Sequence, residues 1–164
     1  MPMDMFLTLA GIEGESTDDK HAKWIEVLSF SHGMNQIIGG SRSSTGAATG
    51  GRVDLNDFNF QKSTDKTTPK LHLFCCNGSH IAKGTFDVCK ATGDKTVFYT
   101  IAFTDLIISS VHATGARNGD GVPSEAVTLN VGEYEWKYVQ TDQKTGKPGG
   151  NVSSKWSLVT NKGA

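Results

Sequence analysis

The amino-acid sequence predicts a mainly β protein, a small antiparallel β-barrel of about seven strands with one short flanking α-helix. Apolar and polar residues alternate along most of the chain, as they do in half-buried strands. The chain also contains 19 glycines together with many serines and threonines, which is typical of strands joined by turns. One convincing helical pattern interrupts the alternation, at residues 68–78.

Length and charge restrict the class of protein. A chain of 164 residues suits one domain, residues 1–164. Its 16 basic and 17 acidic residues leave a net charge of −1, whereas nucleic-acid binders usually carry a basic surplus. No apolar run approaches the ~20 residues of a membrane span. We therefore expect neither a nucleic-acid partner nor a membrane partner.

The first residues do not resemble a signal peptide. They lack a basic start, and Asp4 interrupts the apolar stretch that such a peptide needs. We expect a protein that is cytoplasmic when made. If it leaves the cell, another machine exports it.

Two strands open the chain, at residues 3–9 and 24–33. In the second strand the pattern places Ile25 and Val27 on one face with Ser29 and Ser31. The other face would carry Trp24, Leu28, Phe30 and His32. Because both faces are partly apolar, the strand suggests a second partner beyond the protein core.

Residues 36–51, QIIGGSRSSTGAATGG, form an extended loop with a single charge, Arg42. A loop of this length is unusual in a compact domain. It is either a floppy surface loop or an extended arm that reaches a neighbouring subunit, with Ile37 and Ile38 as apolar anchors. No Gly-Lys-Ser/Thr follows the glycines, so the segment is not a phosphate loop.

The third strand, residues 52–62, changes its phase in the middle. Its apolar residues are odd-numbered before Asn56 and even-numbered after Asp57. One extra residue inserted in a strand produces such a change, so we expect a β-bulge at this point.

The helix has clear start and stop signals. Thr67 or Thr68 is a candidate N-cap, and Pro69 suits the first helical position. Gly78 can adopt a positive φ and end the helix. Leu71, Phe74 and Cys75 form one apolar stripe that should lie on the barrel.

The remaining strands are expected at residues 79–90, 96–112, 125–140 and 152–160. A turn at 92–94 makes the first two of these a hairpin. The strand at 96–112 should bend around the barrel with one apolar face that includes Phe103 and Ile107. Gly132 lies at a change of phase and predicts a barrel corner. Residues 161–164 should form a frayed tail.

The sequence offers little catalytic or metal-binding signal. His72, Cys75 and Cys76 are close together on the helix, but a zinc site needs three or four convergent ligands. We expect a buried thiol pair beside a partly exposed histidine, and no metal or cofactor. A nucleophile elbow, G-x-S-x-G, is absent from the sequence, and we expect no enzyme.

Several segments resemble one family in the same order. They are MFLTLAGIEGES (5–16), HAKWIEVLSFSHGMNQ (21–36), VDLNDFNFQKSTDKTTPKLHLFCCNGSH (53–80) and VTLNVGEYEWKY (127–138). These segments are similar to the haemolysin co-regulated protein (Hcp) family of bacterial type VI secretion systems. The resemblance runs from about residue 3 to residue 158.

The resemblance implies a structural tube protein. Hcp proteins fold as a β-barrel with a flanking helix and assemble as hexameric rings. The rings stack into the inner tube of a contractile, phage-tail-like injector, with a spike protein at the tip, and a sheath ejects the tube. The ring lumen carries and protects effector proteins. Secretion to the extracellular space or a target cell would then need no signal peptide.

Ring formation and cargo transport make different demands on the surface. A ring needs an interface in which one surface meets a different surface of the neighbour. The candidate interface residues are Trp24, Phe30, Ile37, Ile38 and Arg42. A lumen wall should be small and polar, and Ser29 and Ser31 are the candidates for it.

An alternative function is a small-ligand-binding β-barrel. It would need a deep apolar pocket inside the barrel. Large residues such as Phe86, Phe103 and Trp136 are expected to fill that space instead.

Overall fold

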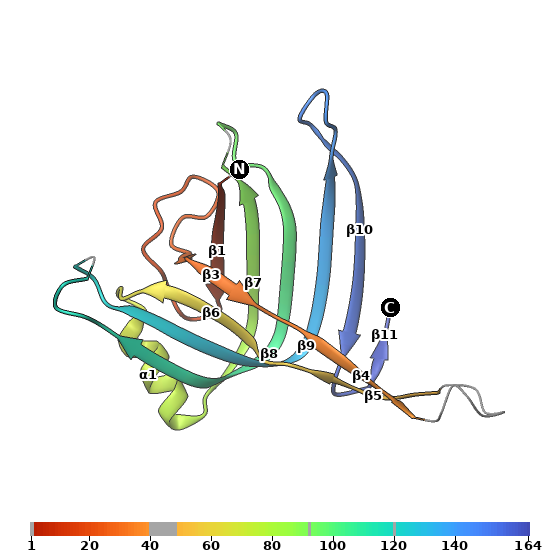
Figure 1. Cartoon of the computed structure of the whole chain (residues 1–164), viewed down its shortest axis with the longest axis horizontal. Helices are drawn as coiled ribbons and strands as arrows, with labels where there is room; N and C mark the ends of the chain where they lie inside the picture. The colour runs from red at the N-terminus through yellow and green to blue at the C-terminus, as the bar shows by residue number, and fades with distance from the viewer. Residues whose placement is uncertain (1, 40–48, 92, 120) are drawn as a thin grey trace.

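The computed structural model describes residues 2–39, 49–91, 93–119 and 121–164 (Figure 1). Within them lie eleven strands and one helix. In chain order they are β1 (Met3–Leu9), β2 (Ile25–Val27), β3 (Ser29–Ser31), β4 (Met34–Gly39), β5 (Thr49–Leu55), β6 (Phe58–Ser63), α1 (Thr68–Asn77), β7 (His80–Lys90), β8 (Val97–Thr114), β9 (Ser124–Thr141), β10 (Pro148–Ser157) and β11 (Lys162–Gly163).

Nine of the strands form one antiparallel, barrel-like sheet. Its main order is β11-β10-β9-β8-β7-β1-β2, and β6 pairs with both β9 and β3. Leu28 alone separates β2 from β3, and its N–H donates to the carbonyl of Gln61 at 2.8 Å. Strand pairing therefore runs from β1 through β7, β8 and β9 to β6. It returns to β1 through β3, Leu28 and β2. The predicted mainly β class with one short flanking helix is confirmed, although the strands number more than seven.

The second predicted strand is interrupted at Leu28, which is 59% exposed. The interruption changes the phase, so Phe30 turns towards the core. Its ring lies 4.7 Å from that of Phe86 and 5.9 Å from that of Phe58. The prediction that Phe30 occupies the face opposite Ile25 is therefore wrong, because the pattern was extended across a break in the strand.

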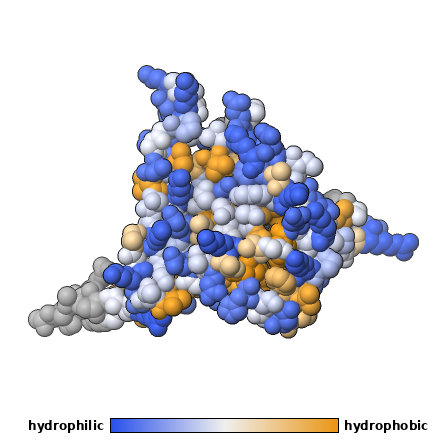
Figure 2. Space-filling model, turned by 180° about the vertical axis from the view of Figure 1, so that it is seen from behind, coloured by the Kyte–Doolittle hydropathy of each residue, from blue (hydrophilic) through white to orange (hydrophobic). Residues whose placement is uncertain are grey.

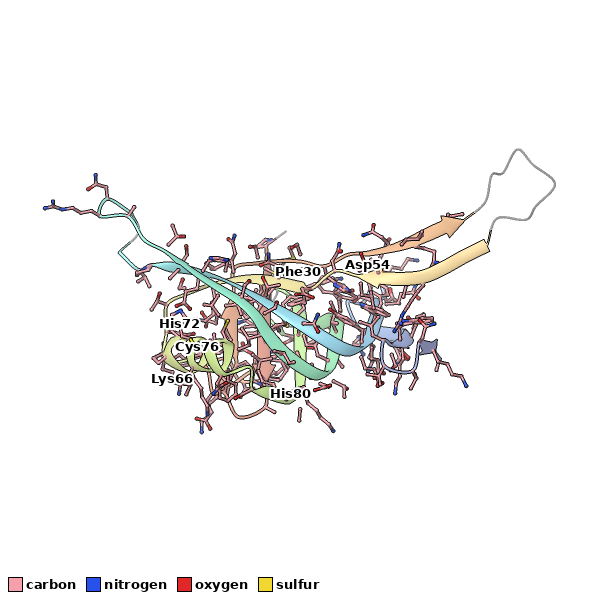
Figure 3. The ribbon with its side chains drawn as sticks, turned by 90° about the horizontal axis from the view of Figure 1, so that it is seen from below. Phe30, Asp54, Lys66, His72, Cys76 and His80 are labelled. Carbon is pink, nitrogen blue, oxygen red and sulfur yellow. The ribbon has the colours of Figure 1, made fainter. Side chains whose placement is uncertain are left out.

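The described parts of the segment predicted as a loop at 36–51, residues 36–39 and 49–51, belong to a β-ribbon. β4 and β5 pair from Met34 with Leu55 to Gly39 with Thr49, as a sheet of their own. Figure 3 shows this ribbon, which carries Asp54, extending away from the main sheet. We call it the arm. The chain passes from the arm to β6 at Asn56–Asp57, where the phase change was predicted.

A corner bends β8 and β9 together. Asp105 has a φ of 55°, and a Cβ on Gly132 would lie 3.4 Å from two carbonyl oxygens of β8. The corner predicted at Gly132 is therefore present. In β8 the buried residues are odd-numbered up to Phe103 and even-numbered from Leu106 onward. The prediction that Phe103 and Ile107 share one apolar face is therefore wrong.

The helix begins and ends as predicted. Pro69 lies in its first turn, and Gly78 follows its end with a φ of 65°. Leu71 is fully buried, while Phe74 and Cys75 pack against the core. The tail is not frayed, because β11 pairs with β10.

A buried ion cluster joins β6, β9 and the start of α1. The Lys62 ammonium is fully buried, 2.9 Å from Glu125 Oε2 and 3.0 Å from Asp65 Oδ1. The Thr68 hydroxyl also donates to Glu125 at 3.0 Å. A buried charge needs such partners to offset its lost hydration. The cluster therefore fixes where the helix leaves the sheet.

A second cluster holds the loop 11–24 against β7. The two ring nitrogens of His21 lie 2.9 Å from Asp18 and 3.0 Å from Asp87, and the ring stacks on Phe6. Lys95 contacts Asp18 at 2.8 Å. Hydrogen bonds from Lys95 and His21 lower the pKa of Asp18 from 3.8 to about 2.

Removing one partner of the buried cluster should destabilise the fold. Glu125→Gln leaves the Lys62 charge with Asp65 as its remaining carboxylate. We expect the free energy of unfolding to fall by about 3 kcal/mol, the lower end for broken buried pairs. Chemical denaturation measures this change. Glu135→Gln is the matched control, because Glu135 pairs with Lys155 at 3.7 Å on the surface and should cost less than about 1 kcal/mol. Equal losses of stability in the two variants would contradict the role given to burial.

Acid should weaken the attachment of loop 11–24. Because the pKa of Asp18 is lower in the folded protein, its stabilisation is complete above pH 3.8 and is lost as pH falls towards 2. Asp18→Asn should lower stability at neutral pH and flatten the dependence over that interval, as measured by urea denaturation at several pH values. Asp19→Asn, which removes the adjacent exposed carboxylate, is the control. If the free energy of unfolding of Asp18→Asn depended on pH as steeply as that of the wild type, the prediction would be refuted.

Candidate functional site: the assembly surfaces

The outward side of β3, β6, β9 and the end of β8 is a continuous surface without formal charge. Alternation in β6 buries Phe58 and Phe60 and turns the residues between them outward. Strand register places Ser29 beside Gln61 and Ser31 beside Asn59. The outward residues, which we call the neutral face, are Ser29, Ser31, Asn59, Gln61, Ser63, Ser110, His112, Thr114, Ser124, Ala126, Thr128 and Asn130.

One carboxylate, Asp57, lies at the border of the neutral face. It accepts hydrogen bonds from Ser109 Oγ at 2.8 Å and from Asn130 Nδ2 at 2.9 Å. These bonds direct both of its oxygens towards the protein. The neutral face therefore presents mainly small hydroxyl and amide groups, with one imidazole at His112, and includes no carboxylate, lysine or arginine.

The arm exposes large apolar side chains. Ile37 is 66% exposed, Ile38 55% and Met34 49%. Figure 2 shows that hydrophobic residues gather in patches between hydrophilic ones on the surface seen from behind. Large apolar side chains exposed on a ribbon that leaves the main sheet favour a contact with another macromolecule. Arg42, the charged residue predicted to act with these isoleucines, lies outside the described residues.

A groove of about 310 Å³ lies at the base of the arm. It is lined by Met34, Gln36, Val53, Leu55, Trp136, Ser154, Lys155 and Trp156. The indole N–H groups of Trp136 and Trp156 are buried and have no hydrogen-bond partner among the described residues. Buried donors of this kind usually find a partner. The groove therefore has largely apolar walls, with two buried indole donors beneath them.

The interior beside the groove is apolar and aromatic. The His32 ring stacks on Tyr134 with centroids 4.6 Å apart. Burial lowers the pKa of His32 and raises that of Tyr134, since it disfavours the charged form of each. Both side chains are therefore neutral at physiological pH, and they contribute packing rather than charge.

The predicted site residues fall into three groups. Ser29 and Ser31 are exposed on the neutral face, and Ile37 and Ile38 are exposed on the arm. Trp24 is half-buried and meets His21 edge-on, while Phe30 packs inside the protomer. The sequence predictions did not include the outward residues of β6, β8 and β9. The alternation in FNFQKS and SEAVTLN contained the signal for them.

The cysteines occupy different environments. Cys89 is buried, and burial raises its pKa to about 11. Cys75 is half-buried against the core, but Cys76 and His72 are exposed. The expected buried thiol pair is therefore wrong for Cys76. Over the described residues, no group of three or more His, Cys, Asp or Glu side chains could hold a metal ion.

Aromatic side chains fill the interior that a ligand-binding barrel would need. The Phe58 ring lies 5.2 Å from that of Phe86 and 4.9 Å from that of Phe103, and all three are buried. The space in which a ligand-binding barrel would hold its ligand is therefore filled by side chains. No helix in the described part of the chain is long and apolar enough to span a membrane.

Comparisons with known proteins agree with this geometry. The family model for "Type VI secretion system effector, Hcp" matches residues 6–138. Protein hcp1 of Pseudomonas aeruginosa is 35% identical over 162 residues, which are 98% of each chain.

Solved structures are also similar. One, described as "Structure of a type six secretion system protein", has a TM-score of 0.94 at 34% identity and covers 99% of this chain and 100% of its own. The crystal structure of Hcp1 from Salmonella typhimurium has a TM-score of 0.81 at 30% identity and covers 100% of both chains. The family match, the full-length relative and the shared fold together show that the chain belongs to the Hcp family of type VI secretion system proteins.

Proposed function

We propose that this chain is the ring-forming subunit of the type VI secretion inner tube. Six copies would close into a ring, and stacked rings would form the tube that a contracting sheath ejects behind a spike protein. Family membership supports the tube role. The observation that carries the proposal is the neutral face, a wide sheet surface with no formal charge.

The neutral face suits the wall of a transport lumen. Charged walls would retain cargo of opposite sign and repel cargo of like sign, since ionic contacts strengthen where water is confined. Hydroxyl and amide groups such as those of Ser31 and Gln61 offer short-lived hydrogen bonds to any polypeptide. Effector proteins could then be carried and protected in the ring and still be released.

The arm suits the contact between neighbouring subunits. A closed ring requires a heterologous interface, so the arm of one copy must meet a different surface of the next. Ile37 and Ile38 project from a ribbon that leaves the main sheet, and their burial would be favourable. The interface role proposed from the sequence therefore rests on these two residues more than on Phe30, which packs inside its own protomer.

The assembled tube would itself be the route of secretion. The contracting sheath would move folded subunits and their cargo to the extracellular space or a target cell. The Hcp family is one of structural, secreted tube proteins and is not known for an enzymatic activity. We accordingly propose a role in assembly and transport rather than catalysis.

Replacing the apolar side chains of the arm should weaken ring formation. The double variant Ile37→Ser/Ile38→Ser removes two exposed hydrophobic side chains without touching the buried core. Native mass spectrometry should show hexamers for the wild type and mainly smaller species for the variant at the same concentration. Thermal unfolding of the dissociated chain should be unchanged.

Leu73→Ser is the matched control for this experiment. Leu73 is 57% exposed on α1, which lies at the opposite end of the molecule from the arm (Figure 3). Its replacement should leave the hexamer intact. Equal assembly by the arm variant and the wild type would remove the arm from the interface.

Bulk on the neutral face should block cargo loading. Ser31→Tyr adds a large neutral side chain at an exposed position and repeats it six times around a ring. We expect intact hexamers that co-purify with at least about tenfold less of an effector that accompanies wild-type rings, because complementary surfaces tolerate inserted bulk poorly. Ser153→Tyr makes the same change on β10, outside the neutral face. Equal loading by the two variants would contradict the lumen assignment.

A further inference from the structure

The ladder of β3 and β6 carries the arm at one of its ends. β3 runs on into β4, and β5 runs on into β6, so the arm prolongs this ladder. The opposite end is marked by Leu28, which precedes β3, and by Thr64, whose N–H donates to the Pro123 carbonyl at 2.9 Å. Figure 1 shows the arm and the loop between β8 and β9 projecting from opposite sides of the molecule. The arm and the Leu28 end therefore face away from each other.

Leu28 separates two surface grooves at its end of the ladder. The first groove, of about 310 Å³, is also lined by Val122, and the second, of about 330 Å³, is also lined by Met3. Leu28 is 59% exposed, Val122 55% and Met3 53%. Three large apolar side chains from distant parts of the chain therefore gather around one pair of grooves. We call these three residues the Leu28 edge.

Acidic groups border the Leu28 edge. Glu15, Glu26 and Asp65 line the first groove, whose lining contains no lysine or arginine. Asp65 is neutralised by the buried cluster, but Glu15 and Glu26 are exposed. In the second groove Lys95 pairs with Asp4 at 3.2 Å. An apolar patch beside exposed carboxylates suits a partner that is both apolar and basic.

The arm has this matching chemistry. Its two neighbouring isoleucines are exposed, and residues 34–53 contain Arg42 and Arg52 but no acidic residue. The one carboxylate of the arm, Asp54, lies in the part of the ribbon nearest the main sheet. The arm is therefore an apolar and basic segment of the kind that the Leu28 edge suits.

We propose that the Leu28 edge receives the arm of the neighbouring copy, an inference that rests on the ring proposed above. Copies related by a rotation close into a ring when two different surfaces of the same chain meet. The opposite ends of one ladder provide such a pair of surfaces. The contact removes the exposed apolar side chains of both surfaces from water, and it brings the basic arm to Glu15 and Glu26.

Leu28→Ser tests the receiving surface on the full-length chain. Leu28 is largely exposed in the protomer, so thermal unfolding of the dissociated chain should be unchanged. Native mass spectrometry should show hexamer formation at least about tenfold weaker than in the wild type, because burying one leucine contributes at least that factor to each contact. Leu73→Ser removes a similarly exposed leucine from α1 and should assemble as the wild type does.

Cross-linking tests which residues are in contact. In a Cys76→Ser background, which removes the exposed native thiol, Glu26→Cys/Ile38→Cys places one new thiol on each surface. A short bis-maleimide, applied to single hexamers separated from stacks by size exclusion, should link the chains into a ladder of up to six on a denaturing gel. Either new cysteine alone, or Ile38→Cys combined with Leu73→Cys, should give no ladder.

The two experiments separate this inference from the proposed ring. Failure of the wild type to form hexamers would overturn the ring and the receiving role with it. Hexamers that depend on Ile37 and Ile38 but persist unchanged in Leu28→Ser would overturn the receiving role alone. So would the absence of a ladder from single hexamers, or a ladder that forms only in stacked rings, where the arm would reach a copy in the next ring.

Discussion

The alternation of side chains along β6 is the constraint on which the rest of the structure depends. This strand lies between β3 and β9, so it links an interior strand of the barrel-like sheet back to the segment that contains β2 and β3. Its inward residues, Phe58 and Phe60, are fully buried among aromatic rings. Because successive side chains point to opposite sides, the same strand must present Asn59 and Gln61 outward. The packed core and the uncharged outer surface are therefore two consequences of one strand.

Two clusters of charged side chains fix the geometry of the fold. The Lys62 cluster sets the position at which α1 leaves the sheet, and the His21 cluster holds loop 11–24 against β7. Both clusters pair their charges within the protomer, and Asp57 uses its oxygens at the border of the neutral face. The neutral face can therefore lack charge even though the chain contains many acidic and basic residues, in nearly equal number. This distribution suits transport of varied proteins better than recognition of one charged ligand.

The exposed apolar groups lie on a different part of the molecule from the neutral face. The arm forms a separate two-stranded sheet, and such a ribbon is marginally stable in water without further contacts. At its base lies a groove beside two buried indole donors that have no hydrogen-bond partner in the described part of the chain. A single protomer therefore has surfaces that remain incomplete, which is the expected property of a subunit.

The sequence by itself determined the β class, the limits of α1 and the corner at Gly132, because alternation, proline, glycine and helical spacing act over a few neighbouring residues. It also identified Ser29, Ser31, Ile37 and Ile38 as surface candidates. Tertiary structure alone decided that Phe30 turns inward after the break at Leu28, that residues 36–39 and 49–51 pair in a ribbon, and that Cys76 is exposed. It also assembled the neutral face, since strand register brings together residues that lie far apart in the chain. Such outcomes depend on long-range pairing, which local patterns do not encode.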